Sequence, residues 1–320
     1  MLQSKRTKLA ILASAVSLKA LVATCAFSGM VSPAFAVNYI VKGLTGGNSA
    51  FGINNSGQAV GLSDQGGIGY ATIWNGTSPT YLGTLTGGLY AGARAIDNSG
   101  DVVGYSDDSL SNGGNFYATV WNGTTPTMLG LLPGANWSVG LGINNNGQTV
   151  GYSNDYGGAG NKDFATIWNG TTPTLLQALP GGDDSVANAI NDSGEVAGFS
   201  NNRPGGNWVA TLWNGPIPTA LGMPQGSNVT FAEGINDFDE VAGVSEYTSY
   251  EQATIWIGTA PTLLPLLPGA VGSVATAIND LGQVAGTTFY GGGYDVATIW
   301  NGMTPSALPG GFGYAYGMND

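Results

Sequence analysis

Side chains able to carry covalent or metal chemistry are scarce in this sequence of 320 residues. It contains no histidine, and its single cysteine, Cys25, lies near the N-terminus. The absence of histidine removes histidine-based acid–base catalysis and the usual zinc and copper sites. One cysteine cannot form a disulfide within the chain, and cleavage of the predicted N-terminal leader that contains Cys25 would remove thiol chemistry as well. The charged side chains are mostly acidic, because 20 acidic residues outnumber eight basic ones.

Carboxylates flank several predicted hairpin turns, and calcium is the metal to consider there because it binds six to eight oxygen ligands. They occur at Asp97/Asp101, Asp192/Glu195 and Asp237/Asp239/Glu240. The equivalent turns at 54–58 and 144–148 have no carboxylate. Hydrogen bonds from Asx side chains to the turn backbone explain these residue types more simply. We expect no cofactor, with a calcium site as the alternative.

A pair of carboxylates can also hydrolyse a glycosidic bond, and Asp183 and Asp184 stand together in a predicted loop. Hydrolases built on repeats usually break the repeat symmetry to form a cleft, and the departures here are small. We therefore predict that the protein is not an enzyme, with a glycan-directed hydrolase as a minor alternative.

Aromatic and charged side chains also gather in the variable segments of the chain, such as 106–117, 200–208 and 287–295. Loops on a rigid scaffold commonly carry binding residues, and this mixture suits a glycan or a protein. The alternative is that these segments are solvated connectors. The candidate binding residues are Asp107, Asp108, Asp155, Arg203, Trp208, Tyr247, Tyr250, Tyr290 and Tyr294.

These segments are positioned by a repeat of about 45 residues, the length of a four-stranded unit. One phrase, ATIWNGTTPTLL at 165–176, has five close copies and is expected to form the first and second strands of each unit. A second phrase, AINDSGEVAG at 189–198, accompanies it and is expected to form the third and fourth strands. Glycine and proline recur too often for long helices. Stacked units would bury the repeated tryptophans, because a unit of this length cannot stand alone. These tryptophans are Trp74, Trp121, Trp168, Trp213, Trp256 and Trp300.

Two glycines in the second phrase have different predicted roles. The first lies in the hairpin turn between the third and fourth strands and needs a positive φ; the fifth copy has Asp239 there, a residue type tolerated in that conformation. The second closes the fourth strand, where we expect neighbouring backbone to pack closely. These strand-closing glycines are Gly61, Gly104, Gly151, Gly198, Gly243 and Gly286.

The combined pattern resembles the HAF repeats of bacterial extracellular proteins. Its best copies are YATIWNGTSPTYLGTLTGG at 70–88 and AINDSGEVAGFS at 189–200, and the resemblance covers nearly all of residues 38–320. The family's histidine is replaced by Tyr70, Tyr117, Phe164, Val209, Gln252 and Val296, and its phenylalanine is always threonine. The resemblance implies an exported protein and brings no catalytic residues with it.

Four short strands in about 45 residues predict an all-β fold, a β-propeller of six to seven blades, with an open β-solenoid as the alternative. The chain has six copies of the first and fourth strands but seven of the second and third. Either its two ends complete one blade together, or the chain continues beyond Asp320.

The N-terminus predicts a secretory signal peptide over residues 1–36, followed by one repeat domain over 37–320. Lys5, Arg6 and Lys8 precede an apolar stretch, and Ala34-Phe35-Ala36 is typical of a cleavage site. The alternatives are a membrane anchor, although Lys19 divides the apolar stretch, and lipid attachment at Cys25. We expect no transmembrane segment after cleavage.

Cleavage would make the protein more acidic. The leader contains four of the eight basic residues and none of the acidic ones, so the formal charge of −12 would become −16. Such a surface disfavours nucleic acid and anionic lipid. We predict an extracellular or cell-surface protein, or a periplasmic one, that acts as a non-catalytic binding module. The alternative functions are a structural stalk or passenger segment of a larger exported protein and, third, a glycan-active enzyme.

Overall fold

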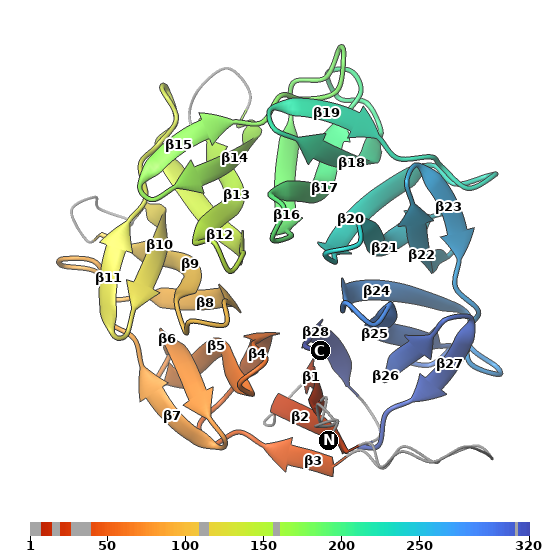
Figure 1. Ribbon diagram of the computed structural model, residues 1–320, viewed down its shortest axis with the longest axis horizontal. Coiled ribbons are helices and arrows are strands. Elements are labelled where there is room, and N and C mark those ends of the chain that lie inside the picture. Colours follow the sequence, from red (N-terminus) through yellow and green to blue (C-terminus); the bar gives the residue numbers. More distant parts are fainter. Residues whose placement is uncertain (1–7, 15–19, 27–39, 109–114, 156–160, 311–312) are drawn as a thin grey trace, which may run out of the picture.

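The computed structural model describes residues 8–14, 20–26, 40–108, 115–155, 161–310 and 313–320. These residues form strands and turns with no helix, so the described chain has no helix able to cross a membrane. The strands make four-stranded antiparallel sheets arranged in a ring, as in a β-propeller (Figure 1). The ring excludes the open solenoid.

The first complete sheet shows how one repeat folds. From the centre outward it contains β4 (Ser49–Ile53), β5 (Gln58–Gln65), β6 (Ile68–Asn75) and β7 (Ser78–Tyr81). The tryptophan phrase forms the third and fourth of these strands, and the Ile-Asn phrase ends the first. Proline is the second residue of the outer strand, as Pro79 is in β7. Its missing N–H is tolerated there because the outer strand lies at the edge of the sheet.

Five further sheets follow the same order from inner to outer strand. The next two are β8 (Ala91–Ile96), β9 (Val102–Asp107), β10 (Phe116–Asn122) and β11 (Thr125–Met128), then β12 (Trp137–Ile143), β13 (Gln148–Asn154), β14 (Asp163–Asn169) and β15 (Thr172–Leu175). The last three are β16 (Ser185–Ile190), β17 (Glu195–Asn201), β18 (Trp208–Asn214) and β19 (Ile217–Ala220), then β20 (Val229–Ile235), β21 (Glu240–Glu246), β22 (Glu251–Ile257) and β23 (Ala260–Leu263), then β24 (Gly272–Ile278), β25 (Gln283–Tyr290), β26 (Tyr294–Asn301) and β27 (Thr304–Ala307).

A seventh sheet joins the two ends of the chain. Its inner strand is β28 (Tyr314–Met318) and its outer strand is β3 (Ile40–Gly43), which are the additional third and second strands counted in the sequence. The two strands between them are β1 (Lys8–Ser14) and β2 (Ala20–Ala26). Both lie inside the predicted signal peptide, so cleavage after Ala36, which stays a prediction, would leave this sheet with β3 and β28.

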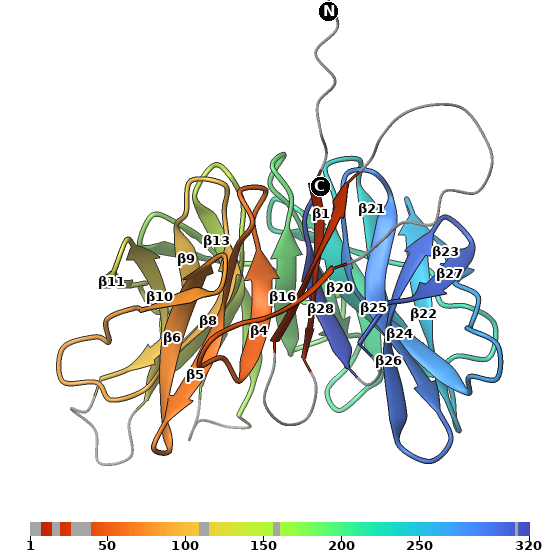
Figure 2. The same cartoon turned by 90° about the horizontal axis from the view of Figure 1, so that it is seen from below.

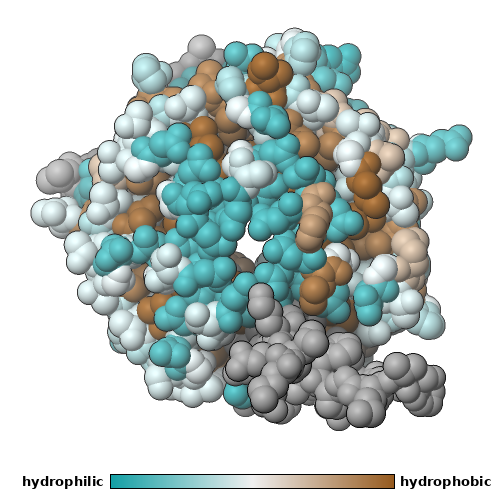
Figure 3. Space-filling view, in the orientation of Figure 1, coloured by the Kyte–Doolittle hydropathy of each residue, from teal (hydrophilic) through white to brown (hydrophobic). Residues whose placement is uncertain are grey.

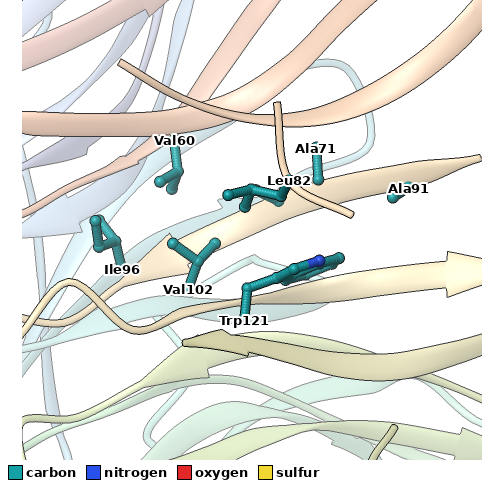
Figure 4. Close-up of a cluster of buried hydrophobic side chains, with 8 residues drawn as sticks. Val60, Ala71, Leu82, Ala91, Ile96, Val102 and Trp121 are labelled. Carbon is teal, nitrogen blue, oxygen red and sulfur yellow. The ribbon is translucent and has the colours of Figure 1, made fainter. Parts of the chain in front are cut away.

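The six repeated tryptophans lie between neighbouring sheets, fully buried. Trp121 packs with Val102 of its own sheet and with Val60, Ala71 and Leu82 of the preceding one (Figure 4). Each indole N–H also donates to a carbonyl oxygen in the connection from the preceding sheet, at 2.6–3.0 Å. The predicted packing of the tryptophans between units is therefore confirmed.

The positive φ predicted for the first set of repeated glycines and the close backbone contact predicted for the second set are confirmed, but the second set does not end its strands: Gly198 lies in the middle of β17. Asp239, the one non-glycine in its turn position, has a φ of 62°. At Gly198 an added Cβ would lie 2.0 Å from the carbonyl oxygen of Val186 on the adjacent inner strand, and the other five strand-closing glycines show the same distance. Any side chain at these positions would push the inner strand away from its neighbour.

Candidate functional site at the central channel

The strands run between two faces of the ring (Figure 2). One face, which we call the turn face, carries the short turns between the first two strands of each sheet, such as 54–58. The opposite face, the loop face, carries the longer connections between the second and third strands, such as 202–207. The seven inner strands β4, β8, β12, β16, β20, β24 and β28 surround the central channel (Figure 1).

At the turn face, the residue after each inner strand is asparagine in six sheets and Asp97 in the other. Within the first six turns its side-chain oxygen accepts hydrogen bonds from its own turn; Asn54, for example, accepts from the backbone N–H groups of Ser56 and Gln58. Each asparagine amide donates to the carbonyl oxygen of the corresponding residue in the next sheet. Asp97 has no amide to donate, so the circle has one gap.

The following residue of each turn forms a second, complete circle, which we call the turn circle. Each backbone N–H donates to the side-chain oxygen of the equivalent residue in the next sheet at 2.8–3.1 Å, and Asp320 closes the circle onto Asn55. Its members are Asn55, Asn98, Asn145, Asp192, Asp237, Asp280 and Asp320. The turn circle therefore joins seven sheets through side chains that are already hydrogen-bonded.

The two circles surround a polar hollow of about 160 Å³, visible as a hydrophilic rim around the central opening (Figure 3). Four successive carboxylates occupy one side of the turn circle. Burial, and then the charges of Asp320, Asp237 and Asp192, raise the pKa of Asp280. Within the described residues, no three acidic side chains are arranged to hold a metal ion. Each of the four carboxylates accepts the backbone N–H of the equivalent residue in the preceding sheet.

Deeper in the channel, every inner strand contains a bulge whose extra residue has no partner on the second strand. A bulge re-aims its side chain away from the regular alternation. We call these seven half-buried residues the channel belt. They are Phe51, Arg94, Leu141, Asn188, Glu233, Thr276 and Tyr316. Seven equivalent positions thus carry seven different side chains, although the surrounding repeat barely changes.

Neighbouring belt residues contact one another across adjacent sheets. The guanidinium carbon of Arg94 lies 4.6 Å from the centroid of the Phe51 ring, and the Phe51 and Tyr316 rings meet edge to face at 5.5 Å. On another part of the belt, the amide of Asn188 donates to the Glu233 carboxyl at 3.2 Å and to the carbonyl oxygen of Ala232 at 2.9 Å. The belt therefore contains two groups of side chains in contact, one of Tyr316, Phe51 and Arg94 and one of Asn188 and Glu233.

Arg94 is held by aromatic rings and not by hydrogen bonds. Its guanidinium carbon also lies 5.5 Å from the centroid of the Tyr105 ring, and its Nε–H is buried with no acceptor. Burial, followed by the charge of Asp163, raises the pKa of Tyr152 to about 12, and Arg94 acts in the opposite direction. In the described part of the chain the single ion pair joins Lys162 to Asp183, so no carboxylate there neutralises Arg94.

Glu233 lies three sheets away from Arg94 around the ring. Burial alone raises the pKa of its carboxyl to about 7, so the group is partly protonated near neutral pH. A neighbouring carboxylate would have added to this shift, and none does. Glycoside hydrolysis uses two carboxyl groups about 5–10 Å apart. Glu233 can donate or accept a hydrogen bond in the channel, and no other described carboxyl group contributes to the shift of its pKa.

The predicted pair Asp183 and Asp184 lies on the loop face. Asp183 pairs with Lys162 and accepts a hydrogen bond from the Asn201 amide at 2.9 Å. Burial raises the pKa of Asp184 to about 6, and its carboxylate accepts the backbone N–H of Asp163. Both groups thus serve local contacts between the third and fourth complete sheets.

The candidate loop residues do not form one cluster. Asp107 is only 6% exposed, and its carboxylate accepts the backbone N–H groups of Leu89 and Tyr90, so it orders a connection instead of facing solvent. Asp108 has a buried oxygen without a hydrogen bond. Asp155 accepts the backbone N–H of Lys162.

The other candidates belong to three further sheets. Trp208 packs edge to face on Phe199 at 5.1 Å, and Arg203 is exposed at the tip of the same hairpin. Tyr247 and Tyr250 stack at 4.5 Å with their rings nearly parallel. Tyr290 and Tyr294 are register partners at the end of the β25–β26 hairpin. The structure therefore brings together the tyrosines of each pair and leaves the pairs on separate sheets.

Arg94 and Glu233 were missed by the sequence analysis, which treated their position as an unspecified letter in the phrase Ala-x-x-Ile-Asn. A signal was present, because the first x differs in every copy while its neighbours repeat. The alternation of a strand does not reveal that a bulge turns this residue into the channel.

The fold is that of known β-propellers. No protein-family model and no curated protein matches the chain. The β-propeller domain of the Trilobed protease from Pyrococcus furiosus has a TM-score of 0.60 and 8% identity, covering 96% of this chain and 97% of that one. TolB from Acinetobacter baumannii has a TM-score of 0.53 and 11% identity, covering 83% and 67%.

A puromycin-hydrolyzing peptidase from Mycobacterium tuberculosis is also similar, with a TM-score of 0.56 and 10% identity. The match covers 95% of this chain and 53% of the peptidase. At these identities the likeness shows the fold alone. The protein is a β-propeller, and its function must be argued from its own residues.

Proposed function

We propose that this protein is a non-catalytic binding module whose ligand contacts the channel belt. One observation carries the proposal: seven equivalent belt positions hold seven different side chains in an otherwise repeated framework. Small polar residues would satisfy a solvated channel at lower cost. An unpaired arginine and a buried glutamate instead cost stability, and such local violations are expected at functional sites.

The proposal includes export and membership of the HAF-type repeat proteins. The charged start, the apolar stretch and the Ala-Phe-Ala sequence support export, and the repeated phrases support the family. The prediction is a secreted product that begins at Val37, detected by N-terminal sequencing and intact mass. A secreted product that retained residues 8–26 would contradict the leader and would leave β1 and β2 in the seventh sheet.

The binding proposal is tested with the purified exported protein. Trp137 and Trp208 are half-buried, whereas the six repeated tryptophans are fully buried, so a fluorescence change on binding reports mainly these two. A panel of mono- and oligosaccharides and short peptides is titrated against the wild type, Asn188→Ala and the loop variant Tyr250→Ala.

We expect a saturable signal that Asn188→Ala weakens and Tyr250→Ala leaves unchanged. Asn188 contributes a belt amide, while Tyr250 lies on the loop face away from the belt. The absence of any saturable signal, or its loss only in Tyr250→Ala, would overturn the belt as the binding site.

A further inference from the structure

We infer that Arg94 binds the carboxylate of an acidic sugar, a uronic acid or an oligosaccharide that contains one. This inference rests on the proposed function and names the ligand of the same site. It follows from what surrounds Arg94, from the side chains elsewhere on the belt and from the charge of the chain.

Among the basic residues whose side chains the structure describes, Arg94 is the one that has both a channel position and no acidic partner. Lys162 is paired with Asp183, while Lys42 and Arg203 are exposed. None of the N–H groups of Arg94 donates to another described residue, and its Nε is buried. The chain has a net charge of −12, so carboxylates are plentiful, yet this half-buried guanidinium has none beside it. Its desolvation therefore lowers the stability of the fold without compensation. A ligand carboxylate would supply the missing partner.

The aromatic contacts prepare Arg94 for this role. Phe51 and Tyr105 lie near the guanidinium at 4.6 and 5.5 Å, which limits the conformations of a long side chain before a ligand arrives. A planar guanidinium held in this way can bind a carboxylate through two parallel hydrogen bonds. A lysine would keep the charge but lose both the paired geometry and the stacking.

The same side of the channel offers surfaces for a sugar ring. Phe51 packs against Tyr316, and Tyr316 stacks on Tyr314 at 6.2 Å. The C–H face of a pyranose packs on such rings, while its hydroxyls need donors and acceptors. Asn188 and Glu233 supply both across the belt, and the polar hollow at the turn face suits hydroxyl groups better than apolar side chains. This combination favours an acidic sugar over a peptide carboxylate.

The number of ligand charges is limited. The channel has one unpaired cation, and ionised Glu233 and the four acidic members of the turn circle repel further carboxylates. A highly charged polyanion would meet this repulsion, as would nucleic acid. One carboxylate on a neutral, hydroxylated body satisfies the belt.

The test is calorimetric titration of the exported protein with four probes. D-glucuronate carries the ring and the carboxylate, D-glucose carries the ring alone, acetate carries the carboxylate alone, and a dialanine peptide carries a peptide carboxylate. The variants are Arg94→Gln, Arg94→Lys and, as a matched control, Arg203→Gln on the exposed hairpin. Near-UV circular dichroism checks that each variant is folded.

We expect glucuronate to bind at least about tenfold more tightly than glucose or acetate, the size of one charge-assisted hydrogen bond. Arg94→Gln should abolish the difference, Arg94→Lys should restore part of it, and Arg203→Gln should not change it. The wild-type comparison of glucuronate with glucose remains decisive if a substitution at Arg94 prevents folding.

Equal binding of glucose and glucuronate, with dependence on Asn188, would overturn the role of Arg94 and leave the belt as a sugar site. Preferred binding of dialanine would overturn the acidic sugar in favour of a peptide. Binding of glucuronate unaffected by Arg94→Gln would overturn the inference. No binding of any probe would also overturn it, and the wider panel above then decides separately whether the belt binds a ligand.

Discussion

The turn circle and the channel belt are two seven-membered rings on the same inner strands, with corresponding residues only four apart in sequence, as Arg94 and Asn98 show. In the turn circle every member is asparagine or aspartate and every member makes the same hydrogen bond. In the belt no residue type recurs and the contacts differ from sheet to sheet. Backbone geometry thus determines the residue type in the turn circle, because each of its side chains must accept a backbone N–H. The belt has no such requirement, so its side chains are available for a ligand.

The largest expected effect lies in the framework that supports both rings. Trp213→Ala should lower the free energy of unfolding by about 3–5 kcal/mol, because it opens a cavity against Ala165, Leu176 and Val150 and removes an indole hydrogen bond. Urea unfolding measures the change. Trp208→Ala, at a half-buried position on the same strand, is the control, and an equal loss there would deny the special role of the repeated tryptophan.

The belt is expected to carry a stability cost that depends on pH. Burial raises the pKa of Glu233 from 4.5 to about 7, so the folded protein holds this proton over a range in which the unfolded chain has released it. The contribution of Glu233 therefore worsens as pH rises from about 4.5 to 7 and is constant above that. Glu233→Gln should stabilise the protein at pH 8 by up to about 3 kcal/mol.

Urea unfolding of Glu233→Gln and the wild type at pH 8 and pH 4.5 measures this difference, which should nearly vanish at the lower pH. Glu246→Gln, on the loop-side end of β21, is the matched control. A stabilisation of Glu233→Gln that was the same at both pH values would show that the carboxyl does not titrate abnormally in the channel.

A smaller effect is expected at Asp97, where the circle of asparagine amides at the turn face has its gap. Asp97→Asn should raise the free energy of unfolding by about 1 kcal/mol, because it supplies an amide toward the Asn144 carbonyl and removes a carboxylate whose pKa burial raises. Asn191→Ala should lower it by about 1–3 kcal/mol, because it removes the bond to the Asn236 carbonyl. Thermal unfolding of both variants tests whether these side-chain amides stabilise the ring; a destabilising Asp97→Asn or a stabilising Asn191→Ala would contradict this role.

The smallest expected effect is on the loop face. Tyr250→Ala removes one stacked ring from Tyr247 at a position 44% exposed, and should cost about 0.5–1 kcal/mol. Equilibrium unfolding measures it, with Tyr294→Ala as an exposed comparison. A loss as large as that of Trp213→Ala would show that the loop face shares the structural role of the framework.

Sequence analysis predicted most of the framework, because each framework residue acts within its own repeat or the next one. The tryptophans, Asp239 at its positive φ and the close backbone contact at Gly198 follow from local turn and strand chemistry. It did not predict that Asp107 would be buried, because nothing near Asp107 in sequence shows that Leu89 and Tyr90 present their N–H groups to it.

The seventh sheet shows the same limit. The unequal number of strands indicated that the ends of the chain were incomplete, but not which residues lie between β3 and β28. Strand pairing between residues more than 280 positions apart has no local signature in the sequence, so the placement of β1 and β2 depends on ring closure.

By itself the sequence determined the blade: its strands, its turns, the burial of its tryptophans and the absence of histidine and thiol chemistry in the repeats. The tertiary structure decided which residues meet in the channel. Successive belt residues lie about 45 positions apart along the chain, and Arg94 and Glu233 lie further apart still. They face a common space only because the bulges turn them inward and the sheets close into a ring.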